Sequence, residues 1–114
     1  MWRRGKRAVA RYLRWRGWRV LARNHRVGHD ELDVIAVHPT KRVLAIVEVK
    51  STATKQRCID RVGYAKQCRI ARASARLPQR WRAGRAMRFD VAEVHVRRWW
   101  CCVRYNAAAF DDPR

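Results

Sequence analysis

Two apolar runs joined by a proline-containing turn constrain the fold of this chain more than any other feature. The runs, Leu32–Val37 and Val43–Val49, are rich in β-branched residues, and Pro39 lies between them. This pattern predicts a β-hairpin. Because the second run is apolar at nearly every position, both of its faces must be buried, whereas a half-exposed strand would alternate.

Acidic residues lie on both arms of this hairpin. Glu31 and Asp33 belong to the first arm and Glu48 to the second, and Lys50 follows Glu48 on the same face of its strand. An even-length turn would set Asp33 opposite Glu48 and Glu31 opposite Lys50. A one-residue slip stays open, because both faces of the arms are largely apolar.

This alignment would force two carboxylates together, since opposed Cβ atoms are only about 4.5–5.5 Å apart. A divalent cation and a lysine would compensate their charge. Magnesium uses one or two carboxylates together with substrate phosphate, and it can activate a water molecule. Lys50 would then position that water or stabilise the transition state. The alternative is an ordinary cross-strand cluster of salt bridges.

The net charge indicates a polyanionic partner. The chain has 28 Lys and Arg residues against 9 Asp and Glu residues, a formal charge of +19, and such self-repulsion is unfavourable without an anion nearby. Nucleic acid is the natural candidate. For the basic side chains, a solvated surface is the alternative to phosphate contact. The candidate contacts are Arg7, Arg11, Arg14, Arg23, Arg26, Lys55, Arg57 and Lys66.

The N-terminal part is expected to supply a helix, a short strand and a loop. Apolar residues at spacings of three and four predict a helix over Gly5–Arg16, with Gly17 at its end. Trp18–Ala22 then fits a short strand. Arg23–His29 is polar and is expected to form a loop that brings arginines beside the acids.

The C-terminal part predicts a helix and a second hairpin. A mobile polar loop is expected over Ser51–Arg57, a long helix over Cys58–Leu77, a basic loop over Gln79–Met87, and strands over Arg88–Val96 and Trp99–Tyr105. Lys66, on the apolar stripe of the helix, would either snorkel to solvent or reach the carboxylates. Trp99, Trp100 and Tyr105 are expected to pack in the core and at the sheet edge, with base stacking as the alternative.

The length fits one domain over residues 1–114, with a core from about 5 to 110 and a polar tail over 111–114. Four cysteines lack the paired spacing of a zinc site and fit free thiols in a reducing compartment. No apolar run is long enough to cross a membrane. The expected location is therefore the cytoplasm.

The motifs in this order resemble a known family. The segments Glu31–Ala36 and Val47–Lys50, then Lys66-Gln67 and Arg88–Val91, are similar to the YraN-like family of uncharacterised bacterial proteins (uncharacterised protein family 0102). The resemblance extends from Gly5 to Phe110. It implies membership of the PD-(D/E)-x-K nuclease superfamily, an α/β restriction-endonuclease-like fold with a small mixed sheet flanked by helices (α-β-β-β-α-β-β), and kinship to Holliday-junction resolvases.

The resemblance also implies roles for individual residues. Asp33 and Glu48 would bind Mg²⁺ or Mn²⁺, Lys50 would be catalytic, and Glu31 and Gln67 would support them. The implied activity is hydrolysis of phosphodiester bonds in DNA, including branched DNA, and a resolvase-like enzyme would need a two-fold dimer to cut both strands.

Two departures from the family pattern bear on that activity. Lys6 stands where the family usually has a glutamate, which removes an acid, and Asp30 stands where it usually has glycine. The alternative function is a nucleic-acid-binding protein that keeps the nuclease fold without turnover. A third is a polyanion-binding accessory to RNA or ribosomes.

Overall fold

A mixed sheet of five strands, in the order β1-β2-β3-β4-β5, forms the centre of the computed structural model, which describes residues 2–52 and 62–113. β3 and β4 are parallel, and the other neighbours are antiparallel. The expected α/β class with a mixed sheet is confirmed. The elements are α1 (Trp2–Trp15), β1 (Arg19–Val27), β2 (Asp30–Val37), β3 (Val43–Thr52), α2 (Tyr64–Ser74), α3 (Gln79–Arg82), β4 (Ala86–Val96) and β5 (Cys101–Phe110).

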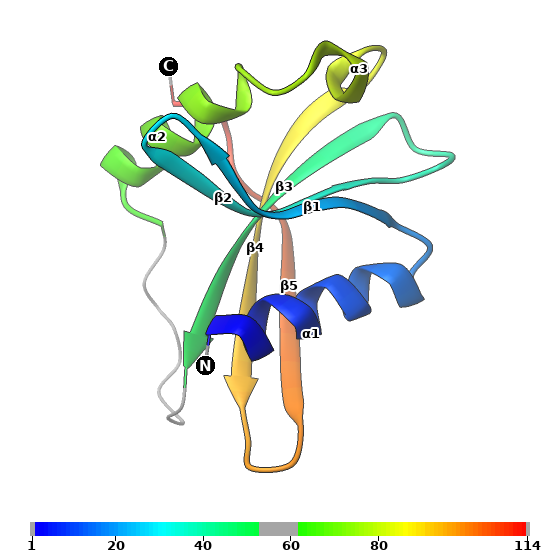
Figure 1. The fold of residues 1–114 in the computed structure, drawn as a ribbon, viewed down its shortest axis with the longest axis vertical. Helices are drawn as coiled ribbons and strands as arrows, with labels where there is room; N and C mark the ends of the chain where they lie inside the picture. Colours follow the sequence, from blue (N-terminus) through cyan, green and yellow to red (C-terminus); the bar gives the residue numbers. More distant parts are fainter. Residues whose placement is uncertain (1, 53–61, 114) are drawn as a thin grey trace.

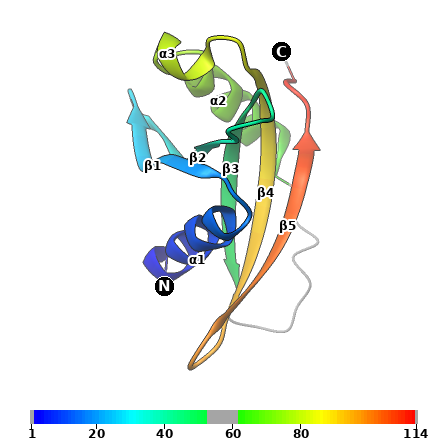
Figure 2. The same ribbon diagram turned by 90° about the vertical axis from the view of Figure 1, so that its right-hand side faces the viewer.

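Helices cover the sheet from two sides (Figure 1). Val9 and Leu13 of α1 pack against one face, together with Val47 of β3. Ile70 of α2 and Leu77, which lies after the end of α2, pack in a second hydrophobic cluster with Ile46 of β3. In Figure 2 the β1–β2 arm projects away from β3, β4 and β5, with α1 close to it. The strong twist of the sheet thus brings residues of β1, β2 and α1 together.

The central hairpin forms as the sequence predicts. Its ladder pairs Ile35 with Ile46 and Val37 with Leu44, which is the expected register. Leu44 and Ile46 belong to the cluster on the α2 side, and Val47 belongs to the cluster on the α1 side. Both faces of β3 are therefore buried, as its continuous apolar run predicts.

The N-terminal expectation is confirmed for the helix and wrong for the loop. β1 continues through Arg23, His25 and Arg26, which pair with residues of β2. The polar side chains are tolerated because β1 lies at the edge of the sheet. The turn is confined to Gly28 and His29, and Gly28 has a φ of +62°, which glycine adopts without strain.

The C-terminal half differs from the expectation in three places. α2 ends at Ser74, short of Leu77, and residues 58–61 at its expected start lie outside the described residues. The short helix α3 begins at Gln79, with Pro78 at its N-cap position, within the expected basic loop. Ser51 and Thr52 extend β3, whereas Lys55 and Arg57 lie outside the described residues.

The second hairpin forms, but its turn is longer than predicted. Arg97 N–H donates to the carbonyl of Trp100, so both tryptophans lie in the turn. Trp99 is 82% exposed and Trp100 is 58% exposed, so the expectation that they pack in the core is wrong. Tyr105 does pack, with its ring stacked on Tyr12 of α1.

Two further expectations concern thiols and the membrane. Within the described part of the chain, Cys68, Cys101 and Cys102 are free thiols. No helix in residues 2–52 or 62–113 is long and apolar enough to cross a membrane.

A buried carboxylate ties β4 to β5. Asp90 is fully buried and accepts hydrogen bonds from Arg88 Nε and Nη2, each at 2.9 Å. It also accepts from the Tyr105 hydroxyl at 2.5 Å and from the Ala108 N–H at 2.8 Å. Desolvation and the Asp90 charge raise the pKa of Tyr105. The phenol therefore stays protonated as a donor.

We expect Asp90→Ala to lower the free energy of unfolding by about 3–5 kcal/mol, because it leaves the buried Arg88 contacts and the Tyr105 hydroxyl without their acceptor. The matched control is Asp30→Ala, which removes an ion pair with Arg72, whose side chain is 60% exposed. This loss should cost less than about 1 kcal/mol. Chemical denaturation measures both. Equal losses would contradict the role of Asp90.

Candidate functional site

β2 and β3 separate at the acidic end of the hairpin. Their ladder ends at the Val34–Val47 pair among the described residues, so the expected ladder neighbours Asp33 with Glu48 and Glu31 with Lys50 do not form. The carboxylate of Asp33 bridges the gap instead, because its Oδ2 accepts the Val49 N–H at 2.8 Å. The Asp33 side chain thus takes the place of a backbone acceptor, and the Val49 N–H holds it in position.

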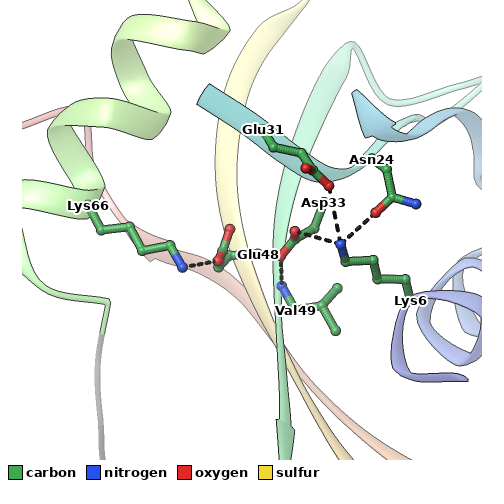
Figure 3. Close-up of polar contacts among 7 residues, drawn as sticks. All are labelled: Lys6, Asn24, Glu31, Asp33, Glu48, Val49 and Lys66. Atoms are coloured by element: carbon green, nitrogen blue, oxygen red, sulfur yellow. Dashed lines mark hydrogen bonds and ion pairs between the residues drawn. The ribbon is translucent and has the colours of Figure 1, made fainter. Parts of the chain in front are cut away.

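The neighbouring edge strand is irregular at the same level. Asn24 lies between the Arg23–Val34 and His25–Leu32 pairs and has a φ of +53°. Asparagine tolerates this left-handed conformation better than most residues. The irregularity places the Asn24 side chain among the charged groups near Asp33 (Figure 3).

Glu48 lies beside Asp33 and is equally buried, at 6% exposed. Burial, followed by repulsion from Asp33, raises the pKa of Glu48 to about 7, although an ion pair with Lys66 opposes the rise. Lys66 Nζ is 2.5 Å from Glu48 Oε1. Of the two readings of Lys66, the structure supports the one in which it reaches the carboxylates.

Lys6 of α1 approaches the acids from the other side. Its Nζ donates to Asn24 Oδ1 at 2.5 Å and lies 3.4 Å from both Glu31 Oε1 and Asp33 Oδ1. Figure 3 shows Glu48 and Asp33 between the ammonium groups of Lys66 and Lys6. The acids are therefore held between cations from two helices.

The approach of α1 depends on a small residue next to Lys6. A Cβ on Gly5 would lie 2.4 Å from the hydroxyl of Ser51 in β3. Any larger residue would displace that side chain or the helix. Gly5 thus lets the helix come close enough to β3 for Lys6 to reach the carboxylates.

The other predicted site residues divide into near and remote ones. Lys50 follows Glu48 by two residues in β3, is half-buried, and pairs with Glu93 in the parallel ladder. Gln67 Nε2 donates to the Val62 carbonyl at 2.7 Å, so it fixes the start of α2 rather than joining the acids. The predicted nucleic-acid contacts exposed on α1 and β1 are Arg7, Arg11, Arg14, Arg23 and Arg26.

Two participants were missed by sequence reasoning. The sequence pattern marks Lys6 only as a missing acid and predicts a loop at Asn24. The signal for Lys6 was its position just before the helical stripe that begins with Val9, which directs it toward the sheet. No sequence pattern indicated the left-handed conformation of Asn24.

The carboxylates fit a hard divalent cation in kind and number. Asp33 and Glu48 offer two adjacent oxygen ligands, and magnesium commonly uses one or two carboxylates with water and phosphate. Burial and the Asp33 charge raise the pKa of Glu48 to about 7 despite the ion pair with Lys66, so Lys66 only partly compensates this acid. No group of three or more metal-ligating side chains occurs within the described ranges, and Lys6 would compete with a cation for Asp33.

The raised pKa of Glu48 predicts a pH-dependent stability in metal-free buffer. Folding favours the protonated acid, so this contribution is complete below pH 4.5 and is lost as the pH rises through about 7. Glu48→Gln keeps a neutral side chain at every pH. Between pH 5 and 8 the wild type should lose up to about 3 kcal/mol of unfolding free energy relative to this variant.

Denaturant titrations in EDTA at the two pH values measure this difference. Asp111→Asn in the exposed tail is the control and should follow the wild type. Parallel pH profiles for wild type and Glu48→Gln would contradict the assignment.

Comparison with known proteins places this chain among relatives of the same kind. It is 39% identical over 101 residues to a UPF0102 protein of Rhodopirellula baltica, covering 86% of this chain and 58% of that protein. The chain thus spans little more than half the length of that relative. A UPF0102 protein of Bordetella avium is 44% identical over 115 residues, covering 96% of this chain and 75% of the relative.

A third relative, a UPF0102 protein of Agrobacterium fabrum, is 42% identical over 101 residues, covering 84% of this chain and 81% of the relative. The model of one protein family matches residues 5–94, which include most of α1, all of the candidate site and most of β4. This chain therefore belongs to the Uncharacterised protein family UPF0102.

Proposed function

We propose that this protein is a magnesium-dependent nuclease of the PD-(D/E)-x-K type that hydrolyses phosphodiester bonds in DNA, including branched DNA, in the cytoplasm. The observation that carries the proposal is the pair of buried carboxylates, Asp33 and Glu48, at the point where β2 leaves β3. A buried acid pair is costly without a function or a cation. It lies on a chain with a formal charge of +19, suited to binding a polyanion.

Each residue of the site would have a role set by its position. Asp33 and Glu48 would hold the cation, which when bound would activate water and offset charge on the phosphate. Lys50 shares the face of β3 with Glu48 and would orient the water or stabilise the transition state. The Val49 N–H donates to Asp33 Oδ2, which leaves Oδ1, 3.4 Å from Lys6 Nζ, as the oxygen that a cation would bind.

We expect purified protein to cut at least one substrate in a panel of single-stranded, duplex, flap and four-way-junction DNA with Mg²⁺ or Mn²⁺. Asp33→Ala, Glu48→Ala and Lys50→Ala should each lower the cleavage rate by about 100-fold or more, while circular dichroism shows an intact fold. Gel electrophoresis of labelled DNA measures the rate. Asp30→Asn is the control on the same strand, because Asp30 pairs with Arg72 away from the site.

Intact DNA in every arm, with binding retained, would count against the nuclease. A resolvase-like action would also need a two-fold dimer, which sedimentation equilibrium measures.

One observation favours a second function. Lys6 Nζ lies within 3.4 Å of Glu31 and Asp33, where its ammonium already supplies positive charge to the acids. A nucleic-acid-binding protein without turnover would need only such a structural cation. In that protein Lys6 and Lys66 would hold the acids permanently, and the basic surface would do the binding.

Metal titration by calorimetry separates the two functions. If the protein is a nuclease, wild type should bind Mn²⁺, Asp33→Ala and Glu48→Ala should abolish binding, and Lys6→Ala should tighten it by about tenfold because it removes the competing charge. Lys41→Ala, on the exposed β2–β3 turn, is the charge-matched control. If neither the wild type nor Lys6→Ala binds Mn²⁺, the result would favour the nucleic-acid-binding protein without turnover.

A further inference from the structure

A hollow on the surface lies between α1 and the turn that joins β4 to β5. Its volume is about 600 Å³. α1 contributes a row of side chains, and the turn contributes two tryptophans. The lining residues that carry the argument are Arg4, Arg7, Arg11, Trp15, Trp99 and Trp100.

The α1 row occupies one face of the helix. Arg4, Arg7, Arg11 and Trp15 recur at spacings of three and four, which aligns them along the axis. At a rise of about 1.5 Å per residue, the row is roughly 16 Å long. No acid lines the hollow among the residues that the structure describes. Its charge is therefore uniformly positive and suits a chain of phosphates.

The aromatic residues are exposed to an unusual degree. Trp15 is 83% exposed, and Trp99 and Trp100 are 82% and 58% exposed. Three exposed tryptophans that line one hollow indicate a binding surface, because exposed apolar side chains are normally scattered singly. Flat aromatic rings beside arginines suit unpaired bases, which stack on the rings while the guanidinium groups hold the phosphates.

One hydrogen bond links the turn to α1. Arg4 donates from Nη2 to the Arg97 carbonyl at 3.1 Å. The guanidinium of Arg98 lies 5.2 Å above the ring of Trp99. Below the patch, Tyr12 stacks on Tyr105 at 5.4 Å between ring centroids. The turn that carries Trp99 and Trp100 thus contacts α1.

The hollow adjoins the candidate site at Arg7. A second hollow is lined by Lys6, Arg7, Arg23 and Asn24, so Arg7 borders both. Lys6 contacts Asp33 directly, and Asn24 accepts a hydrogen bond from Lys6. A strand lying on the tryptophans would therefore lead along α1 toward Asp33.

We propose that the groove between α1 and the β4–β5 turn binds single-stranded polynucleotide and guides it to the acids. Duplex nucleic acid fits less well, since its bases already stack on each other and cannot cover the tryptophans. The proposal rests on the proposed function for its direction toward Asp33, but binding in the groove needs neither metal nor cleavage.

The test measures binding in EDTA by fluorescence anisotropy, with labelled oligo-dT, oligo-rU and a DNA duplex at one stated salt concentration. The double variant Trp99→Ala/Trp100→Ala should bind oligo-dT or oligo-rU at least about tenfold more weakly and duplex less than about twofold more weakly. Phenylalanine at both positions should restore most of the affinity. Arg7→Ala should weaken all binding and reduce the salt dependence.

Tyr64→Ala and Arg69→Ala are matched controls, because both residues are exposed on α2, outside the groove. Unchanged single-strand affinity in the tryptophan variant would overturn the proposal. So would tryptophan-dependent binding to vesicles of phosphatidylserine and phosphatidylcholine without any effect on oligonucleotides, which would make the patch a membrane contact. Groove binding without cleavage in the DNA panel would contradict only the proposed nuclease function. Cleavage without groove binding would contradict only the proposed single-strand groove.

Discussion

The burial of both faces of β3 determines how the rest of the chain is arranged. A strand that is apolar on both sides needs cover from two layers, and α1 and α2 supply one each. The parallel neighbour β4 can be reached only by a crossover, which places α2 and α3 between β3 and β4 along the chain. Packing thus brings two helices, distant in sequence, to the same strand.

Glu48 is the buried acid of this apolar strand, and Asp33 lies beside it on the neighbouring strand β2. Glu48 is buried on the side that Lys66 of α2 can reach, and Asp33 lies on the side that Lys6 of α1 can reach. The two layers that bury the core therefore also deliver the two cations. Since each acid is compensated by a different helix, a change in the position of either helix would alter the balance of charge at the site.

The sequence was most informative where hydrophobic pattern and burial agree. The hairpin register, the doubly buried strand and the α1 stripe were all predictable, because each follows from which side chains must leave water. The predicted β1 is too short, because its second half is polar and a polar segment is typical of a loop. At a sheet edge, backbone pairing with β2 keeps such a segment in the strand. Trp99 and Trp100 were misassigned for the opposite reason: apolar composition predicts burial, and only the position of the turn decides otherwise.

Lys6 and Arg7 are consecutive residues of α1 that serve different surfaces. Successive side chains on a helix point about 100° apart, so one backbone carries both contacts with no joint between them. The backbone geometry of α1 therefore sets the distance between the acids and the groove. The chemistry of either surface can consequently change during evolution by single substitutions, while the spacing stays the same.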